Sequence, residues 1–200
     1  MGQGRPLSAH PPNARPPYAP SVRSFVLSLT GRDRPGIVAA VTRVLLDHRL
    51  NLEDAEMAIL RGHFAVMLVL AAPADVDEEA LRAELERVRA TVPLETVSLT
   101  EVPALAAPPT AATHSISVYG ADHPGIVHAV AEALAGGAVN VLGLSTRVLG
   151  EDDGEPLYAM LLEVALPAGV DPPDLERLLA DVADRQGVDV SVRPVDGDIL

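Results

Sequence analysis

The chain repeats itself, and this repeat limits its possible folds more than any other feature. The sequence DRPGIV at residues 33–38 returns 89 residues later as DHPGIV at residues 122–127. Nine of the twenty positions from 33 to 52 are identical in the two copies at that offset. A long stretch that recurs at a fixed offset indicates two tandem copies of one structural unit.

The later part of each copy matches at a larger offset. Beyond the turn GEDDG at residues 150–154, the offset becomes 94, and six of the positions identical at that offset illustrate the match. They are Ala65, Leu68, Pro73, Leu81, Leu85 and Val88, which match Ala159, Leu162, Pro167, Leu175, Leu179 and Val182. An insertion confined to one turn leaves the neighbouring elements intact, so we expect the two copies to share one fold.

Hydrophobic spacing predicts the order β-α-β-β-α-β in each copy. In the first copy, alternating apolar residues indicate strands near residues 24–30 and 97–99, a strand is expected from about 50 to 60, and the strongly apolar run at 64–70 suits a strand in the middle of a sheet. Apolar stripes at helical spacing follow Pro35 and surround Leu81. The first stripes comprise Ile37, Val38, Val41, Val44 and Leu45, and in the second copy Ile126, Val127, Val130, Ala133 and Leu134. This order predicts an α+β protein of two tandem ferredoxin-like βαββαβ domains.

The domain boundaries follow from composition. Residues 1–23 are rich in proline and lack an apolar pattern, so we expect a disordered arm. Residues 103–112 (PALAAPPTAA) have the composition of a linker. The predicted domains are therefore residues 24–102 and 113–200. In each, two helices would cover one sheet face, and the opposite face would be polar or covered by something else.

Composition disfavours several classes of function. The net charge is −13 and aromatic residues make up 2% of the chain, so neither a basic patch nor a stacking surface for nucleic acid is expected. The absence of cysteine excludes disulfides and thiolate sites. No signal peptide or membrane-length apolar run is visible, which predicts a cytoplasmic protein without membrane contact.

The turn between the first strand and first helix is the candidate binding site. Free N–H groups at a helix start favour a carboxylate, and Gly36 has no side chain to block its approach. Asp33 could accept a hydrogen bond from an ammonium group, and Asn51 offers both a donor and an acceptor. Together these groups suit a free amino acid, and Asp122, Gly125 and Asn140 repeat them at equal spacing.

A structural explanation of the same residues stands beside this one. Aspartate near a helix start can cap exposed N–H groups, and proline suits the first helical turn. Asparagine after a helix can adopt a left-handed conformation. The repeat alone does not separate the two interpretations, because it would preserve structural signals as well as binding residues.

The pattern D-x-P-G-[IV]-V…L…N-[LV], set on β-α-β-β-α-β, resembles the ACT domain over residues 24–102 and 113–193. That family binds amino acids near this turn and at domain interfaces. Two such domains without an enzyme resemble the glycine cleavage system transcriptional repressor group. The resemblance implies a ligand site at Asp33, Pro35, Gly36, Ile37 and Asn51, and again at Asp122, Pro124, Gly125, Ile126 and Asn140. His123 replaces Arg34, so the two sites need not be equivalent.

The resulting hypothesis is a non-enzymatic, amino-acid-sensing regulator without a cofactor or metal. It would bind a small amino acid such as glycine or serine and act through a protein partner, with glycine or one-carbon gene control as the process and a homodimer as the assembly. Two alternatives remain: a regulatory subunit of a separately encoded metabolic enzyme, and a structural dimerisation module with a degenerate site. No catalytic triad, phosphate-binding loop or EF-hand pattern was found, although residues 151–155 are acidic.

Overall fold

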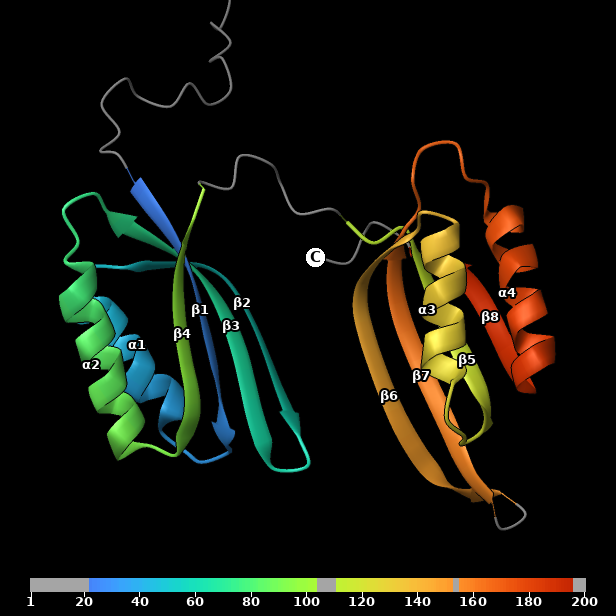
Figure 1. Ribbon diagram of the computed structural model, residues 1–200, viewed down its shortest axis with the longest axis horizontal. Coiled ribbons are helices and arrows are strands. Elements are labelled where there is room, and N and C mark those ends of the chain that lie inside the picture. The colour runs from blue at the N-terminus through green and yellow to red at the C-terminus, as the bar shows by residue number, and fades with distance from the viewer. Residues whose placement is uncertain (1–21, 104–110, 153–154, 196–200) are drawn as a thin grey trace, which may run out of the picture. The chain divides into compact units, whose positions relative to one another are not determined.

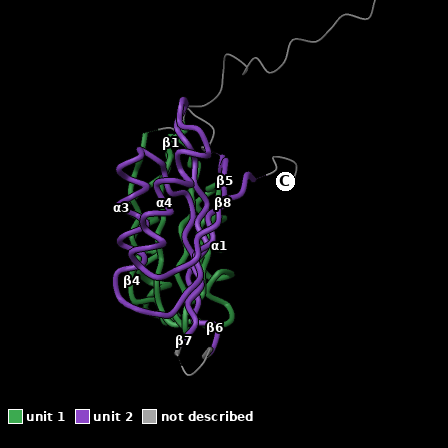
Figure 2. The backbone as a smooth tube through the Cα atoms, turned by 90° about the vertical axis from the view of Figure 1, so that its right-hand side faces the viewer, with its two compact units in different colours: residues 1–107 green, residues 108–200 purple. Residues whose placement is uncertain are grey.

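The computed structural model describes residues 22–103, 111–152 and 155–195. The chain divides into two compact units, unit 1 (residues 1–107) and unit 2 (residues 108–200), coloured separately in Figure 2. Most of the expected arm and linker lies outside the described residues, although Val22 and Arg23 already belong to the first strand. No helix among the described residues is both long and apolar enough to span a membrane.

Unit 1 has the predicted order of elements. They are β1 (Val22–Arg32), α1 (Ile37–Asp47), β2 (Asn51–Leu60), β3 (His63–Pro73), α2 (Glu78–Thr91) and β4 (Leu94–Val102). The strands form one antiparallel sheet in the order β2-β3-β1-β4. Both helices cover the same face of it (Figure 1). This is the ferredoxin-like arrangement expected from the sequence.

Unit 2 repeats this fold, which confirms that the chain holds two tandem ferredoxin-like domains. Its elements are β5 (His114–Ala121), α3 (Ile126–Gly136), β6 (Asn140–Asp152), β7 (Glu155–Ala165), α4 (Pro172–Gln186) and β8 (Val188–Pro194). The sheet order β6-β7-β5-β8 corresponds strand for strand to that of unit 1. The insertion lies in the β6–β7 turn, of which residues 153–154 are outside the described part.

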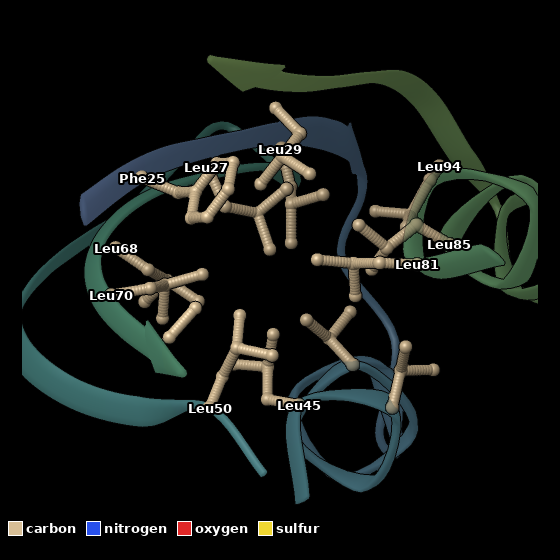
Figure 3. Packing of buried hydrophobic residues seen from close by; sticks show 14 of the residues in the cluster. Phe25, Leu27, Leu29, Leu45, Leu50, Leu68, Leu70, Leu81, Leu85 and Leu94 are labelled. Carbon is tan, nitrogen blue, oxygen red and sulfur yellow. The ribbon is translucent and has the colours of Figure 1, made fainter. Parts of the chain in front are cut away.

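The core of each unit lies between its sheet and its two helices. In unit 1, Phe25, Leu27 and Leu29 of β1 point toward Leu45 of α1 and Leu81 of α2 (Figure 3). Each of the three β1 side chains is at most 1% exposed. Alternate residues of β1 therefore bury one face completely, and this burial sets the orientation of the strand. Ile116 and Val118 of β5 have the same role in unit 2.

The start of each first helix differs from the expectation in two details. Helix α1 begins at Ile37, so Pro35 lies two residues before it rather than within its first turn. Val38 and Val127, expected in the buried stripes, are 52% and 40% exposed. Successive helical residues are about 100° apart, so when Ile37 points into the core, Val38 points along its border.

Candidate functional site

The β1–α1 turn of unit 1 is held in place by its backbone. Asp33 N–H donates a hydrogen bond of 2.9 Å to the Gly62 carbonyl, and Arg32 N–H donates one of 3.1 Å to the Pro93 carbonyl. These bonds attach the turn to the β2–β3 hairpin and to the segment entering β4. In unit 2, Asp122 N–H donates in the same way to the Pro156 carbonyl at 2.8 Å.

Glycine is required in this turn for two different reasons. Gly36 has a left-handed backbone with φ of 97°, and a Cβ added to it would meet nothing within 4 Å. A Cβ on Gly31 would instead lie 2.3 Å from the Pro93 carbonyl oxygen. Thus Gly36 is needed for its conformation and Gly31 for close packing, while the space above Gly36 remains open to a ligand.

The first turn of α1 has no side-chain cap. Neither Asp33 nor any other side chain that the structure describes accepts a hydrogen bond at the Gly36 cap, and the first turn contains no acidic residue. The first intrahelical bond runs from Ala40 N–H to the Gly36 carbonyl, so the N–H groups of residues 37–39 precede it. Asp33 is therefore not the capping residue that the structural explanation required. Helix α3 likewise lacks a side-chain cap at Gly125.

Asn51 and Asn140 lie far from the turns of their own units. Asn51 is level with Ala71 and Ser24, whereas the turn begins after Arg32 at the other end of β1. Seven residues of strand separate Ser24 from Gly31, which corresponds to roughly 23 Å. Helix α1 runs back along the strands, so Asn51, which comes after it, lies at the opposite end of the sheet. The structure thus brings Asp33, Pro35, Gly36 and Ile37 together and leaves Asn51 apart.

Unit 2 distributes its expected site residues in the same way. Asp122, Pro124, Gly125 and Ile126 surround the start of α3, while Asn140 opens β6 opposite Ala165.

An apolar groove lies beside the first turn of α1, between this helix and strands β2 and β3. Its volume is about 190 Å³, and its exposed lining is entirely apolar. Val38 and Thr42 of α1 form one wall, and Leu52 and Met57 of β2 the other. Sequence reasoning missed this groove. The only available signal was Val38, which follows Ile37 directly and so cannot share its buried direction.

The turn of unit 2 is partly covered by the end of α4. His123 Nε2 lies 2.8 Å from the Gln186 carbonyl oxygen, and His123 Nδ1 lies 3.2 Å from that of Pro124. The Gln186 side-chain oxygen is 3.6 Å from the position of a Cβ on Gly125. In unit 1 no described atom lies within 4 Å of the position of a Cβ on Gly36, and Arg34 replaces His123. The two turns are consequently different in shape.

The contacts of His123 favour its protonated form. Carbonyl oxygens only accept hydrogen bonds, and a neutral imidazole carries one N–H, whereas imidazolium carries two. The hydrogen bonds to Gln186 and Pro124, with the charge of Asp122 nearby, raise the pKa of His123 above its usual value.

The strands beside α1 and α3 also carry different side chains. Tyr158 takes the place of Phe64, and Thr146 that of Met57. The Tyr158 hydroxyl is buried near Thr146 without a well-formed hydrogen bond among the described atoms, and burial raises the pKa of Tyr158 although Thr146 opposes that shift. Within the described ranges, no group of three or more His, Cys, Asp or Glu side chains is arranged to hold a metal ion.

Comparison with known proteins places these features in a family. The model of the ACT domain matches residues 23–98. A UPF0237 protein of Methanopyrus kandleri is 48% identical over 63 residues, which are 31% of this chain and 70% of that protein. The phosphoserine phosphatase SerB2 of Mycobacterium tuberculosis is 31% identical over 179 residues, or 86% of this chain. The chain spans only 41% of the length of SerB2.

Two solved structures match both units. An unknown protein from Galdieria sulphuraria has 28% identity and a TM-score of 0.74, covering 88% of this chain and 100% of that one. A protein provisionally assigned as a glycine cleavage system transcriptional repressor has 15% identity and a TM-score of 0.65, covering 88% of this chain and 99% of that one. The second likeness is one of fold.

The two glycines of the first turn provide a stability test. We expect Gly36→Ala to lower the free energy of unfolding by about 1–2 kcal/mol, the cost of a left-handed alanine. Gly31→Ala should cost more, because its Cβ would displace the Pro93 backbone. Urea unfolding followed by circular dichroism measures both. Equal stabilities of Gly36→Ala and the parent would contradict the left-handed turn.

The contacts of His123 predict a dependence of stability on pH. A raised folded-state pKa means that the stabilisation is complete below the usual histidine pKa of about 6.5 and is lost as the pH rises through the folded-state value. His123→Ala should remove this component of the pH profile in thermal melts. His128→Ala is the matched control, because His128 is 82% exposed on α3. A profile unchanged by His123→Ala would show that the imidazole contacts do not contribute.

Proposed function

Because the chain belongs to the ACT domain family, we propose that it is a regulatory protein that binds a free amino acid at the β1–α1 turn of unit 1 and acts through a protein partner. One observation carries this proposal: the uncapped start of α1 lies directly beside an apolar groove. A site for a carboxylate then lies next to a site for an apolar side chain, and a free amino acid with an apolar side chain carries both groups.

Each part of the ligand has a partner in unit 1. The N–H groups of residues 37–39 and the helix dipole would hold the carboxylate. Asp33 is exposed next to them and would accept hydrogen bonds from the ammonium group. The side chain would enter the groove between Val38 and Met57. In unit 2, Gln186 partly covers the corresponding turn, so unit 1 is the proposed binding unit.

The groove changes the expected ligand. Glycine or serine was expected from the sequence, but neither would fill an apolar space of about 190 Å³. Burial of each CH₂ group contributes about 0.8 kcal/mol, so an aliphatic amino acid such as valine or leucine should bind more tightly. Asn51 and Asn140 are not part of this site, since each lies at the far end of its own sheet.

The similarity to SerB2 favours a metabolic enzyme as the class of partner. It extends over 179 residues at 31% identity, whereas the proposed role in glycine or one-carbon gene control is supported only by a neighbour with 15% identity. A transcription factor is the second candidate partner. With a net charge of −13, direct DNA binding would be opposed by electrostatic repulsion. The proposed compartment is the cytoplasm.

A thermal-shift panel of the twenty amino acids, followed by calorimetry, tests the proposal. Ligand at one hundred times its dissociation constant should stabilise the native state by about 2.7 kcal/mol. We expect valine, leucine or isoleucine to raise the melting temperature more than glycine or serine. Asp33→Ala and Val38→Arg should each weaken binding at least tenfold, because they remove the ammonium acceptor and fill the groove.

The repeat supplies matched controls for both changes. Asp122→Ala and Val127→Arg make the same substitutions at the corresponding positions of unit 2, where Val127 is 40% exposed. They should leave binding unchanged. If no amino acid raised the melting temperature, the turn would be structural and the dimerisation module with a degenerate site would be favoured.

A further inference from the structure

One face of the unit 2 sheet has a pattern that the amino-acid site does not explain. Helices α3 and α4 lie on the same face of the sheet, so no described helix of unit 2 covers the other (Figure 1). Tyr119 of β5 and Leu161 of β7 point to this second face and are 47% and 46% exposed. Large exposed side chains grouped on one surface are typical of contact sites.

The pairing register arranges this face in three rows that cross from β6 to β8. The rows are Gly143, Glu163, Ser115 and Arg193; Ser145, Leu161, Ser117 and Ser191; and Arg147, Ala159, Tyr119 and Asp189. On the two central strands, every large side chain stands beside a small one in the same row: Leu161 beside Ser117, and Tyr119 beside Ala159. The face is therefore a series of projections and hollows.

We propose that this face is a homodimer interface that binds the same face of a second copy of the chain. A two-fold axis parallel to the strands places β5 over β7 of the second copy. Leu161 then lies over Ser117 of the second copy, and Tyr119 over Ala159, so each projection meets a hollow. A hollow of about 250 Å³ is present on this face, lined in part by Ser117, Tyr119 and Ala159. Two packed sheets interdigitate in this way at a separation of about 10 Å.

The charges at the edges select the same arrangement. Arg147 on β6 and Asp189 on β8 are exposed at opposite edges of the sheet, three strand spacings or about 14 Å apart. They cannot pair within one unit. The two-fold axis brings Arg147 over Asp189 of the second copy and Asp189 over Arg147, which gives two identical ion pairs. An interface of this kind is isologous, and charge complementarity determines its register.

The corresponding face of unit 1 also has a large side chain beside a small one, Met67 beside Ser28, but it lacks opposite charges at its two edges. The row that matches Arg147 and Asp189 consists of Ala58, Ala65, Thr30 and Thr96, and on this face the β2 edge has only acidic charges while the β4 edge has none. Unit 2 is therefore the self-associating unit. The face is only four strands wide and small by the standards of stable interfaces, so the dimer is reversible and depends on concentration.

Charge reversal at the two edges of the sheet tests this interface. Sedimentation equilibrium should show a monomer–dimer equilibrium, and R147D and D189R should each raise the dissociation constant at least tenfold by opposing like charges. The double variant R147D/D189R should restore dimerisation. An equimolar mixture of the two single variants should also form dimers. In a dimer of one R147D chain and one D189R chain, both edge contacts join opposite charges.

The mixture distinguishes a second copy from any other occupant of the face. R177D is the matched control, since Arg177 is exposed on α4, away from this face, and it should leave the equilibrium unchanged. L161E should abolish dimerisation independently of the edge charges, with circular dichroism confirming the native fold. A chain that stays monomeric at all concentrations, or a dimer unaffected by R147D and D189R, would overturn the proposal. This test is independent of amino-acid binding.

Discussion

The burial of one side of each central strand is the constraint on which the rest of the structure depends. β1 pairs with β3 on one side and β4 on the other, and its alternate residues Phe25, Leu27 and Leu29 are completely enclosed. A shift of one residue would turn all three to the opposite face. The end of β1, and with it the turn at Gly36, therefore has one possible position. The same constraint sends Val26, Ser28 and Thr30 to the other face of the sheet.

The sequence was sufficient to predict the order of elements because that order depends on local spacing. Alternation in β1 and helical spacing in α1 both report on residues that are close in the chain, and the repeat doubled each signal. Gly36 was also visible as part of the repeated motif, although the left-handed conformation that requires a glycine there was not.

The remaining features depend on residues far apart in the chain. Asn51 follows Gly36 by only fifteen residues, which suggested that the two lie close together. Most of those residues form α1, which runs back along the sheet and carries the chain away from the turn. The groove between Val38 and Met57 depends on the distance between helix α1 and the edge strand β2. The spacing of residues along the sequence does not reveal that distance. Likewise, Arg147 and Asp189 share a row only through pairings between β6, β7, β5 and β8. Such pairings join segments whose separation in sequence is unrelated to their separation in space.

The differences between the two copies are more informative about function than their identities. The shared residues maintain the fold, as Gly36 and Gly125 do. Among the residues that differ, two lie at the surfaces that the two proposals use: Arg34 against His123 at the turn, and Ala58 against Arg147 at the sheet edge. Unit 1 has an open turn with an apolar groove, and unit 2 has a partly covered turn and a sheet face with Arg147 and Asp189 at its opposite edges. Duplication followed by divergence at these surfaces would separate ligand binding from assembly.

This separation limits how the ligand can regulate. An amino acid can shift an equilibrium only by the difference between its affinities for the two states. If its binding to unit 1 changes dimerisation through unit 2, then dimerisation must change the affinity for the amino acid by the same factor. Because the two surfaces involve different residues, that factor is accessible to experiment: changes at Val38 act on one equilibrium and changes at Arg147 on the other. If amino-acid binding and dimerisation did not affect each other, the ligand would have to act on the contact with the partner protein instead.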